Sequence, residues 1–181
     1  MTHEGAETME TKKELLRGEK INPPSVTPTI SLDDLVDSTF LSYNAGRIGE
    51  ACQIFTQNML QDNVTVGFSL SGALTPAGLG RSCLIPLMEH GYVDWIVSTG
   101  ANLYHDIHFG LGLPLHKGNH VCNDASLKRE GVVRIYDVFF DYSVLLDTDA
   151  FLRSLFSSRE FRKEMGSAEF HYRLGEHLCR E

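Results

Sequence analysis

The sequence predicts an α/β protein with a parallel sheet flanked by helices, and three segments carry this prediction. Residues 64–69 alternate apolar Val64, Val66 and Phe68 with smaller or polar residues, a pattern typical of a strand. Residues 94–98 (DWIVS) are short and apolar, as expected of a strand buried on both faces of a parallel sheet. Between them, residues 79–90 follow a helical period. The order strand, helix, strand therefore predicts a βαβ unit.

Each of the two predicted strands ends in a loop of small and polar residues. The first strand is followed by Ser71 and Gly72, and the second ends in residues 98–102, STGAN. In an open α/β fold, such loops place backbone N–H groups and helix N-termini at one sheet edge, where nucleotide phosphates bind. Neither loop has GxGxxG spacing, so the same residues would also suit a chain that only turns there. The loops predict a nucleotide site, with that alternative open.

Composition and charge exclude several classes of protein. The chain has 181 residues, 42% of them hydrophobic and 22% charged, which is typical of a soluble globular domain. Its net charge of -8 argues against a nucleic-acid surface, which needs clustered Lys and Arg, and would suit a cationic ligand such as a polyamine. No apolar run approaches the ~20 residues that span a bilayer, so no membrane insertion is expected.

The N-terminal region is predicted to be an arm or linker over residues 1–30, preceding one domain over residues 31–181. Three prolines interrupt residues 21–30, and the first 16 residues contain four glutamates, which fits neither a signal peptide nor a transit peptide. The four cysteines lack CxxC spacing and are expected to be free thiols. We therefore expect a cytoplasmic protein.

The remaining elements follow from periodicity and capping residues. A short helix is expected within residues 12–20, a helix over 32–40 with Ser31 as its N-cap, and a helix over 45–60. Asn102 is expected to cap a helix that ends near Gly110. A strand is predicted over residues 131–137, which continues or turns at 138–140, and a turn is predicted at 141–142. Three further helices are predicted: one over residues 150–156 capped by Asp149, one that begins at Ser157–Ser158, and a last one capped by Ser167.

Histidines are concentrated after the second loop. His105 and His108 are three residues apart, so they share a helix face, a spacing compatible with a zinc site completed by His116 or His120. The alternative is that these histidines are solvated or satisfied in the core. The absence of CxxC and HExxH motifs favours this alternative, and we predict no metal.

Four segments between Phe40 and Leu152 resemble the deoxyhypusine synthase family. In order, they are FLSYNAGRIGEACQIF, VGFSLSGALTPAGLG, VDWIVSTGANLYHD and GVVRIYDVFFDYSVLLDTDAF. The resemblance implies a Rossmann-like, NAD-binding fold and a homotetramer. It also implies NAD-dependent oxidation of spermidine, with the aminobutyl group passed through an imine on an enzyme lysine. The acceptor is a lysine of a translation initiation factor or a small amine.

The resemblance also implies cofactor-binding residues. In the first loop they are Ser71, Gly72, Ala73 and Thr75, and in the second Ser98, Thr99, Gly100 and Ala101, with Asp106 at an acidic position of the family. Small residues let the backbone approach a pyrophosphate, and hydroxyl groups can bond to it. Asp106 would pair with a cationic substrate or, as we expect, order the loop.

The chain departs from the family at two places within these segments and lacks a third feature. Gly72–Ala73 and Tyr104–His105 replace a Ser-Asn pair and a pair of glutamates of the eukaryotic form, which makes a bacterial-type relative acting on a small amine plausible. Lys117, Lys128 and Lys163 do not match the catalytic lysine segment. We therefore expect a domain truncated at its C-terminus, inactive alone and prone to oligomerise. The alternative is a non-catalytic regulatory or scaffold subunit.

Overall fold

The structure is a computed structural model that describes residues 11–179; residues 1–10 of the expected arm lie outside the described residues. The chain divides into two compact units, residues 1–64 and residues 65–181. The boundary proposed from the sequence, between residues 30 and 31, stays a prediction. Among the described residues, no helix combines the length and apolarity needed to cross a bilayer.

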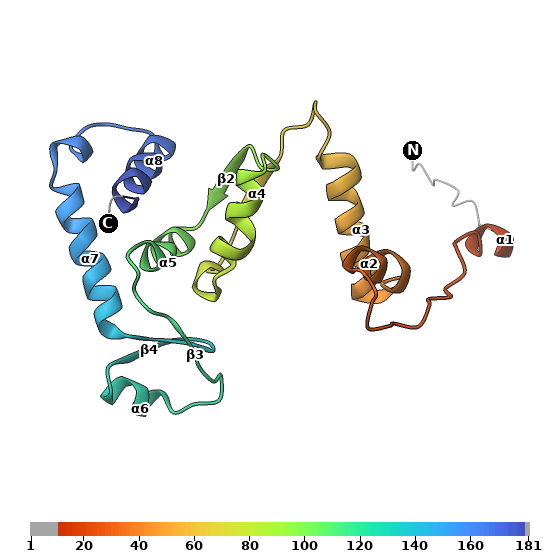
Figure 1. Cartoon of the computed structure of the whole chain (residues 1–181), viewed down its shortest axis with the longest axis horizontal. Helices are drawn as coiled ribbons and strands as arrows, with labels where there is room; N and C mark the ends of the chain where they lie inside the picture. Colours follow the sequence, from red (N-terminus) through yellow and green to blue (C-terminus); the bar gives the residue numbers. More distant parts are fainter. Residues whose placement is uncertain (1–10, 180–181) are drawn as a thin grey trace, which may run out of the picture. The chain divides into compact units, whose positions relative to one another are not determined.

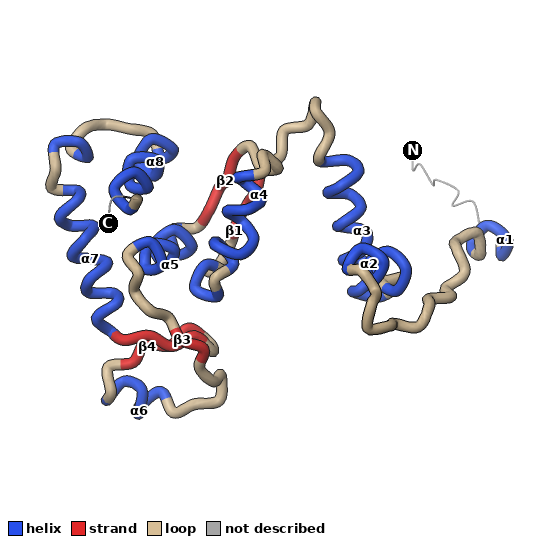
Figure 2. The backbone as a smooth tube through the Cα atoms, viewed as in Figure 1, coloured by secondary structure: helices blue, strands red, loops and turns tan. Residues whose placement is uncertain are grey.

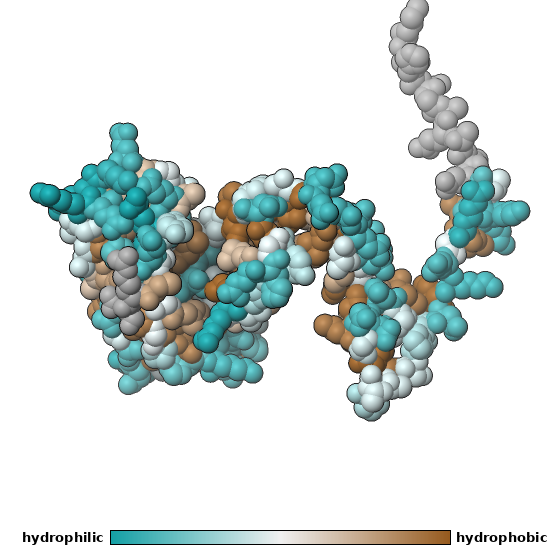
Figure 3. All heavy atoms as spheres, turned by 45° about the horizontal axis from the view of Figure 1, so that its top comes forward, coloured by the Kyte–Doolittle hydropathy of each residue, from teal (hydrophilic) through white to brown (hydrophobic). Residues whose placement is uncertain are grey.

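The first unit is helical. It contains α1 (Lys12–Leu15), α2 (Leu32–Thr39) and α3 (Tyr43–Ile54), and α3 continues into a π-helical segment, Phe55–Met59. Ser31 caps α2 as predicted, because its Oγ accepts a hydrogen bond from the Asp34 backbone N–H at 3.2 Å. Figure 3 shows hydrophobic side chains open on the α2–α3 hairpin, where Leu32 and Ile48 are exposed.

The second unit contains a small parallel sheet, as the βαβ prediction required. Strand β1 (Gly67–Leu70) pairs in parallel with β2 (Trp95–Ser98), and Leu70 lies opposite Ser98. The crossover between them contains a 3-10 turn (Thr75–Ala77), a π-helical segment (Gly80–Leu84) and helix α4 (Ile85–Glu89). Helix α5 (Gly100–Gly110) follows β2 directly (Figure 1). The mixed α/β class is thus confirmed.

The prediction that the second strand is buried on both faces is wrong. Trp95 and Val97 are 52% and 58% exposed. Trp95 lies beside the backbone of Gly67, where an added Cβ would fall 2.1 Å from the indole ring. Trp95 and Val97 are two positions apart and so lie on the same face of this sheet, which is therefore open to solvent.

A second sheet is antiparallel and was not predicted. Strands β3 (His116–Lys117), β5 (Val138–Asp141) and β4 (Val132–Ile135) lie in that order, apart from the parallel pair in Figure 2. The chain turns back between β4 and β5 at Tyr136, whose φ of 55° is unusual for a residue with a side chain. The strand expected over residues 131–137 therefore ends at Ile135, and residues 138–140, where a continuation or a turn was expected, belong to the returning strand β5. Helix α6 (Asp124–Arg129) precedes this hairpin.

The helical core of this unit forms where α5 meets the two C-terminal helices. Helix α7 (Tyr142–Phe156) is followed by a 3-10 turn (Arg159–Phe161) and α8 (Ser167–Leu178). Ile107, Leu155 and Leu174, one from each of α5, α7 and α8, are packed together in the core. Several helix starts in this region were predicted wrongly. Helix α7 is capped by Asp141, eight residues before Asp149, and Gly166 rather than Ser167 precedes α8. The helix expected from Ser157–Ser158 is only the 3-10 turn.

We predict that this core sets the stability of the second unit. Leu155 is 8% exposed, so replacing it by alanine in the full chain should lower the free energy of unfolding by about 2–5 kcal/mol, measured by urea denaturation. Leu146→Ala on the same helix is the matched control. Because Leu146 is 49% exposed, its replacement should cost less than about 1 kcal/mol. Equal losses for the two variants would contradict this description of the core.

Candidate functional site

The two loops predicted to bind a nucleotide lie side by side. Because β1 and β2 are parallel and end in register, residues that follow Leu70 and Ser98 emerge at the same sheet edge. The backbone N–H of Thr99 donates to the Leu70 carbonyl at 3.1 Å and extends the ladder into the loops. The geometry that a shared binding edge requires is therefore present.

The buried side chain of Asn102 joins the two loops through hydrogen bonds. Its side chain is 1% exposed, and its Oδ1 accepts from the backbone N–H groups of Leu74 at 2.7 Å and Thr75 at 3.4 Å. Its Nδ2 donates toward the Ser71 carbonyl at 3.4 Å and to the Thr99 hydroxyl at 3.2 Å. Asn102 was predicted to cap α5, but the N-cap position is held by Thr99. Asn102 instead fixes one loop to the other.

Thr99 adds a direct bond between the loops. Its Oγ1 donates to the Gly72 carbonyl at 2.6 Å, so it makes no side-chain capping bond to α5. Gly72 has φ of +63°, a conformation that residues with a side chain rarely adopt. Gly72 therefore lets the first loop turn toward Thr99.

The rim of this edge is exposed and lined by backbone. Ser71, Gly72, Ala73, Gly100 and Ala101 are all exposed. In the described part of the chain, the N–H groups of Gly100 and Ala101 have no hydrogen-bond acceptor, as is usual at a helix start. A Cβ added at Gly100 would meet no atom within 4 Å. These features fit an anionic group such as a pyrophosphate, because free amides and the helix dipole favour negative charge.

Three other residues predicted to bind cofactor lie away from this rim. Thr75 is 4% exposed, and its hydroxyl donates to the Asn102 carbonyl at 2.6 Å, so it supports the loop. The half-buried Ser98 directs its hydroxyl to the Thr99 carbonyl at 3.2 Å. Asp106, one helical turn after Asn102, lies against Gly80, where an added Cβ would come within 2.6 Å of its Oδ1. Asp106 thus faces the crossover helix.

His105 and His108 form a buried hydrogen-bond chain. His105 Nδ1 and His108 Nε2 are 3.0 Å apart, and His108 Nδ1 lies 2.8 Å from the hydroxyl of Thr148 on α7. His108 is fully buried, and burial, followed by the charge of His105, lowers its pKa to about 4. Among the described residues no group of three His, Cys, Asp or Glu side chains is placed to hold a metal. The burial of His108 and its contacts with His105 and Thr148 fit the alternative of a histidine satisfied in the core.

The hydrogen-bond chain also fixes where the protons lie. The Thr148 hydroxyl has no other partner within residues 11–179, so it must donate to His108 Nδ1 or leave a buried proton unpaired. His108 then donates from Nε2 to His105 Nδ1, and neutral His105 carries its proton on Nε2. Burial also lowers the pKa of His105, which favours this neutral form. In this arrangement the N–H donor of His105 is the ring nitrogen that does not contact His108.

Tyr104, the residue before His105 in α5, also connects α5 to α7. Its hydroxyl donates to Asp149 Oδ1 at 2.8 Å and lies 3.3 Å from the Leu145 carbonyl. Burial, the bond to Asp149 and the charge of Asp149 raise the pKa of Tyr104 to about 12. Asp149, predicted to be a helix cap, is thus an acceptor for Tyr104 within α7.

Sequence reasoning missed Thr148 and Arg81. Thr148 lies in the middle of a helix, and no sequence pattern pairs it with a histidine 40 residues away. Arg81 lines the groove that Asp106 faces. Arg81 is the only basic residue between Thr75 and Glu89, which is a signal that could have singled it out.

We predict that Asn102 holds the first loop in place. Asn102→Ala removes the acceptor of the Leu74 N–H and should lower the free energy of unfolding by about 1–3 kcal/mol. Amide hydrogen exchange at Leu74 should accelerate in this variant and remain slow in Asn102→Asp, which keeps the acceptor oxygen. Ser71→Ala, at an exposed hydroxyl of the same loop, is the control and should change neither quantity. Unchanged exchange at Leu74 in Asn102→Ala would show that other contacts hold the loop.

We predict that stability falls on acidification because His108 resists protonation. Its pKa is about 4 in the folded chain and near 6.5 when unfolded, so only the unfolded chain takes up this proton in between. The stabilisation that neutral His108 gives to the folded chain is complete above pH 6.5. It is lost as the pH falls toward 4, which lowers the free energy of unfolding by up to about 3 kcal/mol. His108→Gln should flatten the profile of unfolding free energy against pH, whereas the exposed His116→Asn should not. A profile of equal slope in His108→Gln would rule out this origin.

Comparison with known proteins places the chain in a family. A family model described as deoxyhypusine synthase matches residues 35–181. A deoxyhypusine synthase-like protein of Nostoc punctiforme is 51% identical over 161 residues, which are 89% of this chain and 41% of that protein. A probable deoxyhypusine synthase 1 of Methanosarcina acetivorans is 37% identical over 133 residues, 73% of this chain and 42% of that protein. The chain therefore spans about two-fifths of the length of these relatives, and it belongs to the deoxyhypusine synthase family.

Proposed function

We propose that this chain supplies the NAD-binding part of a deoxyhypusine synthase-like transferase with a Rossmann-like fold. The reaction would be transfer of an aminobutyl group from spermidine to a lysine of a translation initiation factor or to a small amine. The observation that carries the proposal is the pair of loops at the ends of β1 and β2, joined through Asn102. Family membership supports the choice of NAD as the ligand of this edge.

The residues at the rim would hold the cofactor through backbone. The free N–H groups of Gly100 and Ala101 would face its pyrophosphate, and Ser71, Gly72 and Ala73 would leave room for close approach. Thr75, Ser98, Thr99 and Asn102 would keep the two loops in position. When bound, NAD supplies the hydride acceptor for oxidation of the amine.

The imine-forming lysine would come from a segment other than these residues. An imine-forming lysine must be desolvated or placed near another cation to be neutral enough to attack. Each of the six lysines is exposed, and Lys163 is ion-paired with Glu169 at 2.8 Å. The residues described here would then act together with that lysine-bearing segment, in a cytoplasmic oligomer that is a homotetramer in the family.

We predict that a negative charge at the start of α5 abolishes most NAD binding. Ala101→Asp should weaken binding to the full chain at least tenfold in isothermal titration calorimetry, because the carboxylate repels the pyrophosphate. The helix itself should be unharmed or slightly stabilised, since an acidic residue in the first turn favours the helix dipole.

The control is Ala125→Asp, which places the same charge at the second residue of α6. It should bind NAD as the unchanged chain does, and circular dichroism should show both variants folded. Equal affinity of Ala101→Asp and the unchanged chain, or no binding of NAD at millimolar concentration by the unchanged chain, would contradict the proposal.

A further inference from the structure

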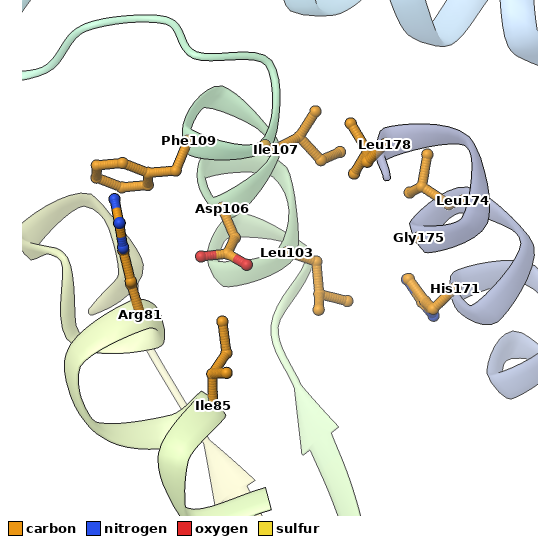
Figure 4. Close-up of a pocket in the computed structure, with 11 residues that line it drawn as sticks. Arg81, Ile85, Leu103, Asp106, Ile107, Phe109, His171, Leu174, Gly175 and Leu178 are labelled. Atoms are coloured by element: carbon orange, nitrogen blue, oxygen red, sulfur yellow. The ribbon is translucent and has the colours of Figure 1, made fainter. Parts of the chain in front are cut away.

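A second pocket lies between the crossover helices, α5 and α8, away from the loops. Its volume is about 440 Å³, and none of its lining residues belongs to residues 71–75 or 98–101. Figure 4 shows side chains from the three elements around one space. Most of them are apolar: Ile85, Leu103, Ile107, Phe109, Leu174 and Leu178. The pocket is large enough for a small organic molecule and offers it a hydrophobic wall.

Two opposite charges face this pocket without partners. Within residues 11–179, neither the Asp106 carboxylate nor the Arg81 guanidinium makes a hydrogen bond or an ion pair. Asp106 is half-buried, and burial raises the pKa of its carboxyl. In Figure 4 the Arg81 side chain extends toward the ring of Phe109 rather than to the carboxylate. A half-buried carboxylate that lacks a partner is costly, so a cation beside it would be stabilising.

The space that Asp106 occupies depends on Gly80. An added Cβ at Gly80 would lie 2.6 Å from Asp106 Oδ1, so a larger residue there would require the carboxylate to move. Arg81, the next residue, brings its guanidinium to the same pocket. The adjacent residues Gly80 and Arg81 of the crossover therefore lie next to one charge and supply the other.

We propose that this pocket binds a small zwitterion, an α-amino acid with an aliphatic side chain. Its ammonium group would donate to Asp106, its carboxylate would pair with Arg81, and its side chain would pack on the apolar wall. Guanidinium groups bind carboxylates through two parallel hydrogen bonds, which suits Arg81 to this role. A simple amine would leave Arg81 unpaired, and a simple acid would leave Asp106 unpaired. The zwitterion is the ligand that satisfies both.

We predict that L-leucine binds the full chain and that both of its charges are needed. In isothermal titration calorimetry, isopentylamine and 4-methylpentanoate, which each lack one charge, should bind at least tenfold more weakly. Asp106→Asn and Arg81→Gln should each weaken L-leucine binding at least tenfold. Asp62→Asn and Arg162→Gln remove exposed charges elsewhere and should leave it unchanged. NAD binding should persist in Arg81→Gln, which separates this proposal from the previous one.

A variant that fills the pocket provides an independent test. Gly175 lines the pocket within α8, and a Cβ added there meets no atom within 4 Å. Gly175→Leu should fold at least as well as the unchanged chain, because leucine favours a helix over glycine by up to about 1 kcal/mol. It should nevertheless lose L-leucine binding, whereas Ala168→Leu on the same helix should keep it.

Three results would overturn the proposal. One is the absence of L-leucine binding at millimolar concentration. Another is equal binding of isopentylamine and L-leucine, which would make the pocket a simple cation site. The third is unchanged affinity in Gly175→Leu, which would place the ligand elsewhere.

Discussion

The candidate site depends on one buried amide, the side chain of Asn102. The strands that lead into the loops are four residues each, and neither loop has a hydrophobic cluster of its own to hold it. What fixes the loops is a set of hydrogen bonds that use both the donor and the acceptor of the same amide. Each such bond contributes only about 1 kcal/mol, but leaving a buried donor without an acceptor costs more. The position of Asn102 at the third residue of α5 thus couples the helix start to both loops.

Helix α5 connects this edge to the core through the side on which Ala101 lies. This side of the helix carries Ala101, His105 and His108, which follow one another at steps of four and three. The last of them, His108, is hydrogen-bonded to Thr148 of α7. Since burial keeps His108 neutral, this contact brings no charge into the core. Tyr104 and Asp149 add a second polar tie between the same two helices. The loops are therefore placed by a helix that is itself fixed along its length.

The sequence allowed prediction of those features that local patterns encode. The two parallel strands, the Ser31 cap and the adjacency of the loops follow from alternation, capping chemistry and strand direction. The position of the hairpin turn at Tyr136 was not predicted because this turn lacks the Asn-Gly or Asp-Gly pair that normally marks a positive φ. Asn102 was predicted to be a cap because asparagine is a common N-cap, and only tertiary structure shows that its amide faces the other loop. Arg81 and Asp106 share a pocket although 25 positions separate them, a relation that no periodicity reveals.

The two ligands proposed for α5, an anionic dinucleotide and a zwitterion, can share the helix because electrostatic effects at a helix end are short-ranged. The first turn of α5 contains no acidic residue, so the partial positive charge of its free amides is not neutralised from within the helix. The first carboxylate on the helix is Asp106, at its seventh residue and against Gly80, beyond the turn where the dipole acts. Screening limits the influence of distant charges to about 8 Å in physiological salt. A chain with a net charge of -8 can therefore offer an anion site at the N-terminus of α5 and, in its second turn, a carboxylate that accepts the ammonium group of the proposed zwitterion.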